Sequence, residues 1–136
     1  MNPTTPRENG SSPDDLSFEI RFFENLSRRD PKDVRVLEVL AHHYTKSGRI
    51  SDGLRIDRRI VRHDPANPLA HYNLACSLAL KKRKKEAVES LCVAVERGYG
   101  DIDWMLRDDD LASLREYAPF LQLVKRVVHE SETGGR

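Results

Sequence analysis

Residues 30–67 read DPKDVRVLEVLAHHYTKSGRISDGLRIDRRIVRHDPAN, and this stretch decides the fold. An Asp-Pro pair opens it and returns 34 residues later, with the two prolines at Pro31 and Pro65. Between the pairs, apolar residues recur every three or four positions, which is the spacing of an amphipathic helix. Gly48 divides the stretch into two parts, each long enough for one helix, and glycine commonly ends helices. The stretch therefore predicts a helical hairpin.

A shift of 34 residues also aligns positions outside this hairpin, as a tandem repeat would. It places Leu40 and Ala41 on Leu74 and Ala75. Three further columns unite Ile20, Leu54 and Val88; Leu26, Ile60 and Ala94; and Phe23, Asp57 and Leu91. Small residues stand where paired helices must approach closely, at Ala41, Gly53, Ala75 and Ala87. The chain is therefore predicted to be all-α and built from antiparallel helical hairpins.

The apolar spacing predicts helices at about 17–29, 34–46, 51–63, 68–80 and 85–97, then a short helix around Trp104 and a last helix after Pro119. Residues 1–15 are polar and rich in proline, so they are predicted to form a disordered tail. Residues 130–136 are polar and contain two glycines, which predicts a flexible C-terminal tail. Residues 16–129 are the single helical domain expected of a chain of 136 residues.

The charge of the chain is balanced, with 23 Lys and Arg residues against 22 Asp and Glu residues. No overall field therefore draws it to nucleic acid or to an anionic membrane. The densest cationic cluster runs from Lys81 to Lys85 and is the weak candidate for a nucleic-acid contact. We expect it to be a solvated turn, because no aromatic residues interleave it.

The two cysteines, Cys76 and Cys92, lie within predicted helices and not in the spaced framework of a disulfide-rich secreted domain. The N-terminus has no apolar run behind a basic start, and no later window approaches the ~18–20 apolar residues of a membrane span. These features predict a cytoplasmic protein without a membrane partner.

The repeat resembles that of the tetratricopeptide repeat (TPR) family in its residues as well as its period. One copy matches the family pattern at Leu37, Leu40, Ala41, Tyr44, Gly48, Gly53, Ile60 and Pro65. A second copy matches at His71, Leu74, Ala75, Leu78, Ala87, Leu91 and Ala94, with Lys82 replacing the turn glycine and Tyr99 replacing the proline. Residues 98–120, GYGDIDWMLRDDDLASLREYAPF, resemble the closing segment of many bacterial members. The resemblance implies a short right-handed α-solenoid of about two to two and a half TPR units plus C-terminal capping helices.

In TPR proteins the first helix of each hairpin lines a concave groove that takes a peptide or a partner helix. The resemblance therefore implies a non-catalytic module that binds another protein or peptide. The residues that it places on the concave face are Arg35, Glu38, Val39, His42 and Thr45 of one helix and Leu69, Tyr72, Asn73 and Cys76 of the next. Tyr72 is expected to be the main anchor, because large amphipathic rings dominate binding hot spots. The alternative is that these residues are simply solvated helix faces.

Some TPR proteins hold the C-terminal carboxylate of a partner with lysine, asparagine and arginine side chains. Asn73 matches one of these positions, but Glu38 and His42 stand where the pattern has a lysine and an asparagine. A carboxylate at position 38 would repel the carboxylate of the partner. Asp103 opposes the match and Arg107 supports it, so we do not expect this mode of binding.

Asp57 departs from its column, in which Phe23 and Leu91 are apolar. A buried carboxylate is costly unless it is paired or hydrogen-bonded. We therefore expect Asp57 to lie at a partly wetted edge and to pair with a nearby arginine. The alternative is a polar switch or a contact to a binding partner.

No metal, cofactor or catalytic residue is predicted. The ligand-type residues His42, His43, His63, His71, Cys76 and Cys92 show no metal-binding spacing. Cys76 with His42 is the one conceivable nucleophile pair, and the sequence supplies no glycine-rich turn or evident oxyanion site for it. An enzyme is therefore not expected.

Self-assembly is the alternative function. The first predicted helix carries Phe18, Phe22 and Phe23 and has no helix before it. These rings could stack on another copy and make the chain a structural, homo-oligomeric scaffold piece.

Overall fold

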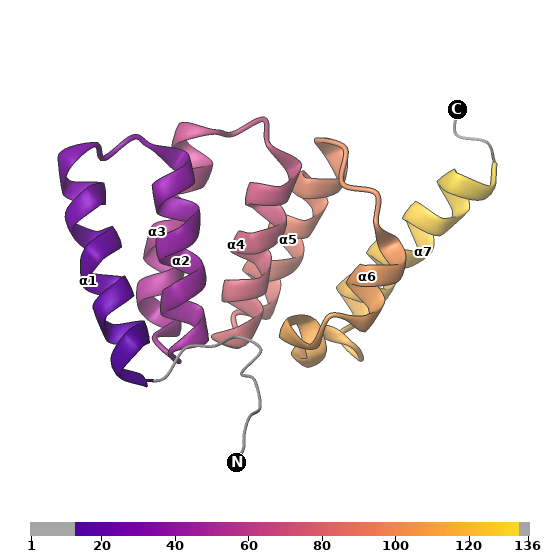
Figure 1. The fold of residues 1–136 in the computed structure, drawn as a ribbon. Helices are drawn as coiled ribbons and strands as arrows, with labels where there is room; N and C mark the ends of the chain where they lie inside the picture. The colour runs from indigo at the N-terminus through magenta and orange to yellow at the C-terminus, as the bar shows by residue number, and fades with distance from the viewer. Residues whose placement is uncertain (1–12, 134–136) are drawn as a thin grey trace, which may run out of the picture.

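A computed structural model describes residues 13–133, and this range contains helices and no strand. The helices are α1 (Pro13–Arg29), α2 (Val34–Lys46), α3 (Ile50–His63), α4 (Pro68–Leu80), α5 (Lys84–Glu96), α6 (Ile102–Arg107) and α7 (Ala118–Glu132), with a short 3-10 helix, η1 (Asp109–Leu114), before α7 (Figure 1). The all-α prediction is confirmed.

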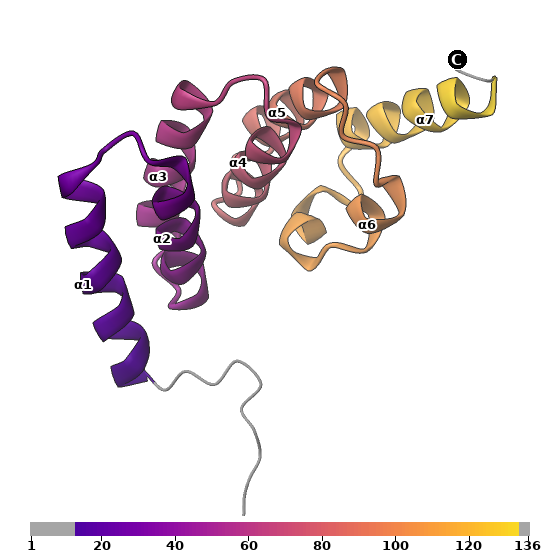
Figure 2. The same cartoon turned by 45° about the horizontal axis from the view of Figure 1, so that its top comes forward.

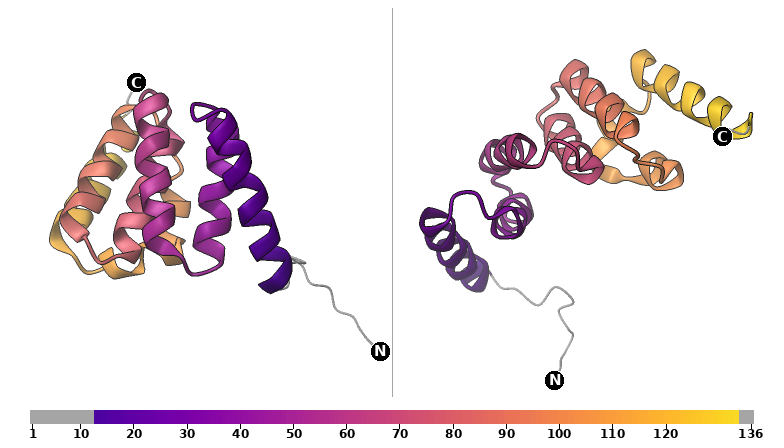
Figure 3. Two further views of the ribbon diagram at one scale, coloured as in Figure 1. Left: turned by 90° about the vertical axis from the view of Figure 1, so that its left-hand side faces the viewer. Right: turned by 90° about the horizontal axis from the view of Figure 1, so that it is seen from above.

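The helices stand side by side in a curved row, with α1 and α7 towards its two ends (Figure 2). Successive helices α1 to α5 pack on one another, and α4 also packs on η1. In the view from above, α2, α4 and α6 follow the inner side of the curve, and α3, α5 and α7 the outer side (Figure 3). The architecture is the predicted short right-handed solenoid of antiparallel hairpins, followed by capping helices.

Local side chains fix where the inner helices begin. The Asp33 carboxylate accepts hydrogen bonds from two backbone N–H groups of the first turn of α2. The Asn67 side chain does the same for one N–H group of α4, and Pro68 follows at a position that suits proline. Asp101 and Asp108 cap α6 and η1 in the same way. Each cap satisfies N–H groups that the first turn of a helix leaves unpaired.

The turns at the helix C-termini require a left-handed backbone. Gly48 has a φ of 84° and Gly98 a φ of 115°, a region that glycine enters without strain. Lys82 occupies the position equivalent to Gly48 and adopts the same conformation, with a φ of 64°. The substitution of the repeat glycine therefore preserves the turn at the cost of some backbone strain.

The core of the hairpins contains columns that the 34-residue shift aligns. Ile20, Leu54 and Val88 are all buried, as are Leu40 and Leu74. Gly53 lies where α2 and α3 meet, and a Cβ atom there would come within 2.9 Å of the Thr45 hydroxyl oxygen. The small residue at this position thus permits the close approach that the sequence predicted.

The closing segment covers the end of the last hairpin. Met105 of α6, Leu111 and Leu114 of η1, and Phe120 of α7 belong to the same buried cluster as Leu91 of α5. The segment therefore completes the core, and in doing so it also brings the acidic residues of its loops next to α4.

The ends of the helical region differ from the prediction. Helix α1 begins at Pro13 inside the expected tail, because proline followed by two aspartates favours a helix start. Helix α7 continues through Glu132, because no helix-breaking residue occurs before Gly134. The remaining tail residues, 1–12 and 134–136, lie outside the described range.

None of the helices between residues 13 and 133 combines the length and the apolar content of a membrane-spanning helix.

Candidate functional site

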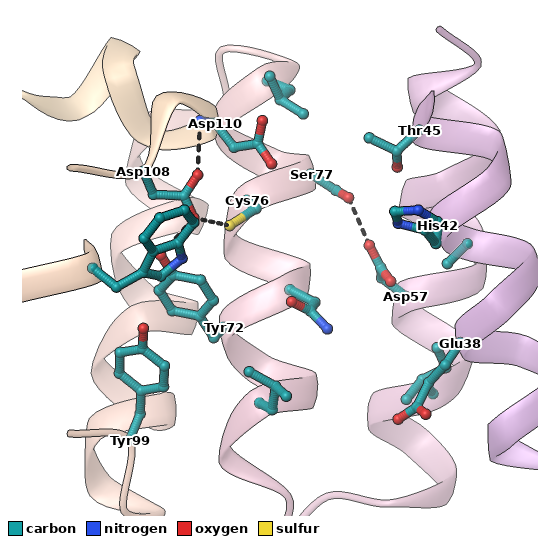
Figure 4. A pocket seen from close by; sticks show the side chains of 16 residues that line it. Glu38, His42, Thr45, Asp57, Tyr72, Cys76, Ser77, Tyr99, Asp108 and Asp110 are labelled. Carbon is teal, nitrogen blue, oxygen red and sulfur yellow. Dashed lines mark hydrogen bonds between the residues drawn. The ribbon is translucent and has the colours of Figure 1, made fainter. Parts of the chain in front are cut away.

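A groove with a volume of about 330 Å³ opens between α2, α4 and the closing segment, with α3 at its base (Figure 4). The residues that line it are Glu38, Ala41, His42 and Thr45 of α2; Asp57 and Ile60 of α3; Leu69, Tyr72, Asn73, Cys76, Ser77 and Leu80 of α4; and Tyr99, Trp104, Asp108 and Asp110 of the segment after α5. Two successive repeats and the closing segment therefore build one surface.

The structure brings most of the sequence-predicted site residues to this groove. Glu38, His42, Thr45, Leu69, Tyr72, Asn73 and Cys76 line it. Arg35 and Val39 are exposed on α2 but lie outside the lining. These two residues therefore belong to a part of the α2 surface outside the groove.

Tyr72 forms part of the wall and not an exposed anchor. Its side chain is only 3% exposed, and its hydroxyl donates a hydrogen bond of 2.7 Å to Oδ2 of Asp108. Its ring stacks on that of Tyr99, with the ring centroids 4.4 Å apart. Burial and the bond to Asp108 raise the pKa of Tyr72, so the phenol stays protonated and keeps donating. The buried ring positions its neighbours and offers little area of its own to a ligand.

Two large apolar side chains do offer such area. Leu69 of α4 is 53% exposed and Trp104 of α6 is 46% exposed, and both line the groove. The sequence pattern predicted only that Trp104 belongs to a short helix. The closing segment lies beyond the repeat, so the 34-residue shift aligns no other residue with Trp104. One feature of the sequence does point to Trp104 as a contact. It is the single tryptophan of the chain, and tryptophan is enriched in binding hot spots.

Asp108 organises the wall formed by the closing segment. It is 7% exposed, and its carboxylate accepts hydrogen bonds from the Tyr72 hydroxyl, from the Cys76 thiol at 3.7 Å and from the Asp110 backbone N–H at 3.0 Å. The Arg115 guanidinium donates to the Asp108 backbone carbonyl. This role of Asp108 was not predicted, because α4 and the start of η1 meet only in the folded chain.

Asp57 lies on the opposite side of the groove, and its surroundings differ from those predicted. It is buried, at 6% exposure, and its carboxylate accepts a hydrogen bond of 2.6 Å from the Ser77 hydroxyl of α4 (Figure 4). Within residues 13–133, no ion pair joins it to an arginine. Burial raises the pKa of Asp57 to about 7, and the Ser77 bond opposes that rise. The expectation of a wetted edge and an arginine partner is therefore wrong, since α4 covers the side chain.

The groove is acidic. Four carboxylates line it, from Glu38, Asp57, Asp108 and Asp110, and the lining contains no lysine or arginine. Burial, followed by the neighbouring Asp108 and Asp109 charges, raises the pKa of Asp110. Glu38 and Asp57 lie on one side of the groove, and Asp108 and Asp110 on the other (Figure 4). A positive group in the groove would thus meet carboxylates from both sides.

A metal site was tested at the one place where ligand-type atoms converge within the described residues. The Cys76 sulfur and carboxylate oxygens of Asp108 and Asp110 lie within 4.8 Å of one another. Burial, with the Asp108 charge, raises the pKa of the Cys76 thiol, whereas a metal needs the thiolate. Oδ2 of Asp108 already accepts the Tyr72 and Cys76 hydrogens. These groups act as a hydrogen-bonded wall, and the protonated thiol is equally unsuited to be a nucleophile.

Two other surfaces that the sequence pointed to lie elsewhere. The cationic run from Lys81 to Lys85 is exposed and spans the turn after α4 and the first two residues of α5, and Arg83 pairs with Glu86. On α1, Phe18 is 63% exposed and Phe22 is 50% exposed, while Phe23 is half-buried against the core.

The folded chain is similar to a solved helical-repeat structure. The crystal structure of MamA, a TPR-like protein, matches it with a TM-score of 0.69 and 20% sequence identity, over 85% of this chain and 68% of that chain. No protein-family model and no curated protein sequence matches. At this identity the likeness concerns the fold alone, and it shows that the chain has a TPR-like helical-repeat fold.

Proposed function

We propose that this chain is a non-catalytic interaction module that binds a peptide or a segment of a partner protein in the groove between α2, α4 and the closing segment. The observation that carries the proposal is the groove itself, which combines exposed apolar area at Leu69 and Trp104 with polar groups such as Asn73. Protein-binding surfaces have this composition, with an apolar centre beside polar groups that fix orientation.

The likeness to MamA and the repeat columns support a place for the chain in the TPR family, with a closing segment of the bacterial type. In such solenoids the inner helix faces are the extended surfaces available for binding. The proposed contacts are the predicted groove residues Glu38, His42, Thr45, Leu69 and Asn73, with Tyr72 and Cys76 as the buried wall behind them. Arg35 and Val39 would extend the surface along α2. The free thiols of Cys76 and Cys92 favour the reducing cytoplasm as the location. Nucleic acid is not part of the proposal, since the Lys81 to Lys85 turn lies outside the groove lining.

A displayed library of short random peptides, selected on the immobilised protein, tests the proposal. The selected peptides are expected to bind wild-type protein and to lose about 3- to 10-fold in affinity on Leu69→Ala, because an exposed apolar contact is removed. Leu121→Ala is the matched control, since Leu121 is 44% exposed on α7 outside the groove. Equal loss in both variants, or the absence of selected peptides, would refute binding in the groove.

Self-assembly through α1 is the second candidate. The observation that favours it is the pair of exposed rings at Phe18 and Phe22 on the first helix of the row. Light scattering is expected to show a dimer that Phe22→Glu dissociates, because burying a charge in an apolar contact is costly. A monomer at high protein concentration would refute this candidate and leave the groove proposal intact.

A further inference from the structure

We infer that the occupant of the groove is a cationic segment of a partner polypeptide, one that carries arginine or lysine. This inference rests on the proposed function and adds the chemistry of the partner to it. The observations that support the inference are the charged groups and the aromatic rings of the residues that line the groove.

Carboxylates face the groove from both of its sides, and cations do not balance them. The ion pairs between described residues engage Glu19, Asp52, Glu86 and Asp109, none of which lines the groove. The lining carboxylates therefore contribute net negative potential to a concave surface, where low-dielectric walls concentrate it. A cationic side chain is the group that gains most from this position.

The aromatic part of the lining suits the same group. Guanidinium and ammonium groups are attracted to the faces of tryptophan and tyrosine rings. Trp104 already attracts such a group within the chain, since Cζ of Arg107 lies 5.8 Å from the centroid of its ring. Tyr99, which stacks on the buried ring of Tyr72, lies on the same side of the groove as Asp108 (Figure 4). An arginine of the partner could thus lie between rings and carboxylates.

The same charges exclude the opposite kind of partner. A peptide carboxylate or an acidic side chain would enter a surface with four carboxylates and, as candidate cation, His42 alone. Like charges at such a surface reduce both affinity and association rate. The groove therefore selects for a partner that carries positive charge.

The test uses the peptides selected on the immobilised wild-type protein at low salt and about pH 8, where Asp57 is ionised. We expect them to be enriched in arginine and lysine relative to the unselected library. Binding is measured through the fluorescence of Trp104, the single tryptophan of the chain, with selected peptides that contain no tryptophan. Because the ring lies in the groove, its signal reports occupancy of this surface.

The decisive variant is Glu38→Gln with Asp110→Asn, which removes one carboxylate from each side. It is expected to weaken binding by about 5- to 10-fold and to flatten the salt dependence, because two charge contacts are lost. The matched control, Glu89→Gln with Glu116→Gln, removes the same charge from exposed positions outside the lining and should leave the affinity within about 2-fold. The exposed single variant Glu38→Gln gives a second measurement if the double variant is less stable.

The outcomes separate the inference from the proposed function. Selected peptides that are neutral or acidic, yet lose affinity on Leu69→Ala, would overturn the cationic partner and support a binding groove. Cationic peptides whose affinity is the same on the double variant and on wild type would also overturn it. Failure to select any peptide that depends on Leu69 would refute both.

Discussion

Two buried aspartates on opposite sides of the groove differ in how their carboxylates are satisfied. Asp57 and Asp108 are almost equally buried, at 6% and 7% exposure. Asp108 accepts hydrogen bonds from a phenol, a thiol and a backbone N–H, whereas the bond found for Asp57 comes from the Ser77 hydroxyl. Burial alone therefore does not define the role of a carboxylate. A well-satisfied one holds the fold together, and a sparsely satisfied one remains a source of cost and of pH sensitivity.

The largest loss of stability is expected from Asp108→Ala. The change leaves the buried Tyr72 hydroxyl without its acceptor and removes the cap of η1. Together these losses should lower the free energy of unfolding by about 3 kcal/mol. Chemical denaturation measures the change, and Asp109→Ala, at an exposed neighbouring position, serves as control. A loss below about 1 kcal/mol would mean that Asp108 does not organise its wall.

Asp57→Asn should do the opposite and stabilise the protein at neutral and alkaline pH. The pKa of Asp57 is raised from 3.8 to about 7, so between these values the unfolded chain loses a proton that the folded chain retains. The stability contributed by the protonated form is therefore complete below about pH 4 and is lost as the pH rises to about 7.

Asparagine removes this loss and still accepts the Ser77 hydrogen bond, so we expect a gain of about 2 to 4 kcal/mol at about pH 8 and little change at about pH 4. Thermal and chemical unfolding across this range measure the difference between variant and wild type. Taking the difference isolates Asp57 from the other titrating groups of the groove, Glu38, His42 and Asp110. A variant less stable than wild type at about pH 8 would contradict the comparison.

Ser77→Ala removes the hydroxyl that donates to Asp57. The ionised carboxylate then loses a charge-assisted hydrogen bond, so stability should fall by about 1 to 2 kcal/mol at about pH 8 and by less at about pH 4. In the Asp57→Asn background, the loss of stability caused by Ser77→Ala should be smaller at about pH 8. Equal effects at both pH values would show that the serine contributes through packing alone.

Tyr72→Phe is expected to have the smallest effect, a loss of about 1 kcal/mol. It removes one donor from Asp108, but the backbone N–H of Asp110 and the Cys76 thiol continue to donate, and the ring still stacks on Tyr99. Chemical denaturation at neutral pH provides the measurement. A loss as large as that of Asp108→Ala would mean that the phenol bond carries the whole network.

The repeat made the helical part of the fold predictable. Positions such as Ile20, Leu54 and Val88 were grouped by a shift of 34 residues and are all buried, and the glycine position at residue 48 returns as a left-handed turn at Lys82. The resemblance to the TPR family implied which faces of α2 and α4 line the concave side. Most of the residues predicted in this way line one groove.

The burial of Asp57 and the roles of Asp108 and Trp104 could not be derived in this way. Each depends on contacts between segments that are distant along the chain, such as Ser77 with Asp57 or Tyr72 with Asp108. The closing segment has no counterpart under the shift, so the repeat gives no information about where its side chains lie.

The sequence by itself determined the succession of helices, their caps and turns, and the columns of the core, because these follow from spacing within about 34 residues and from the local chemistry of helix ends. The tertiary structure alone decided the charge and depth of the groove. The closing segment packs against α4 and, with α2 and α3, places four carboxylates around one hollow. Hydrogen bonding and burial depend on which groups are brought together in space, and these determine the electrostatic character of the site.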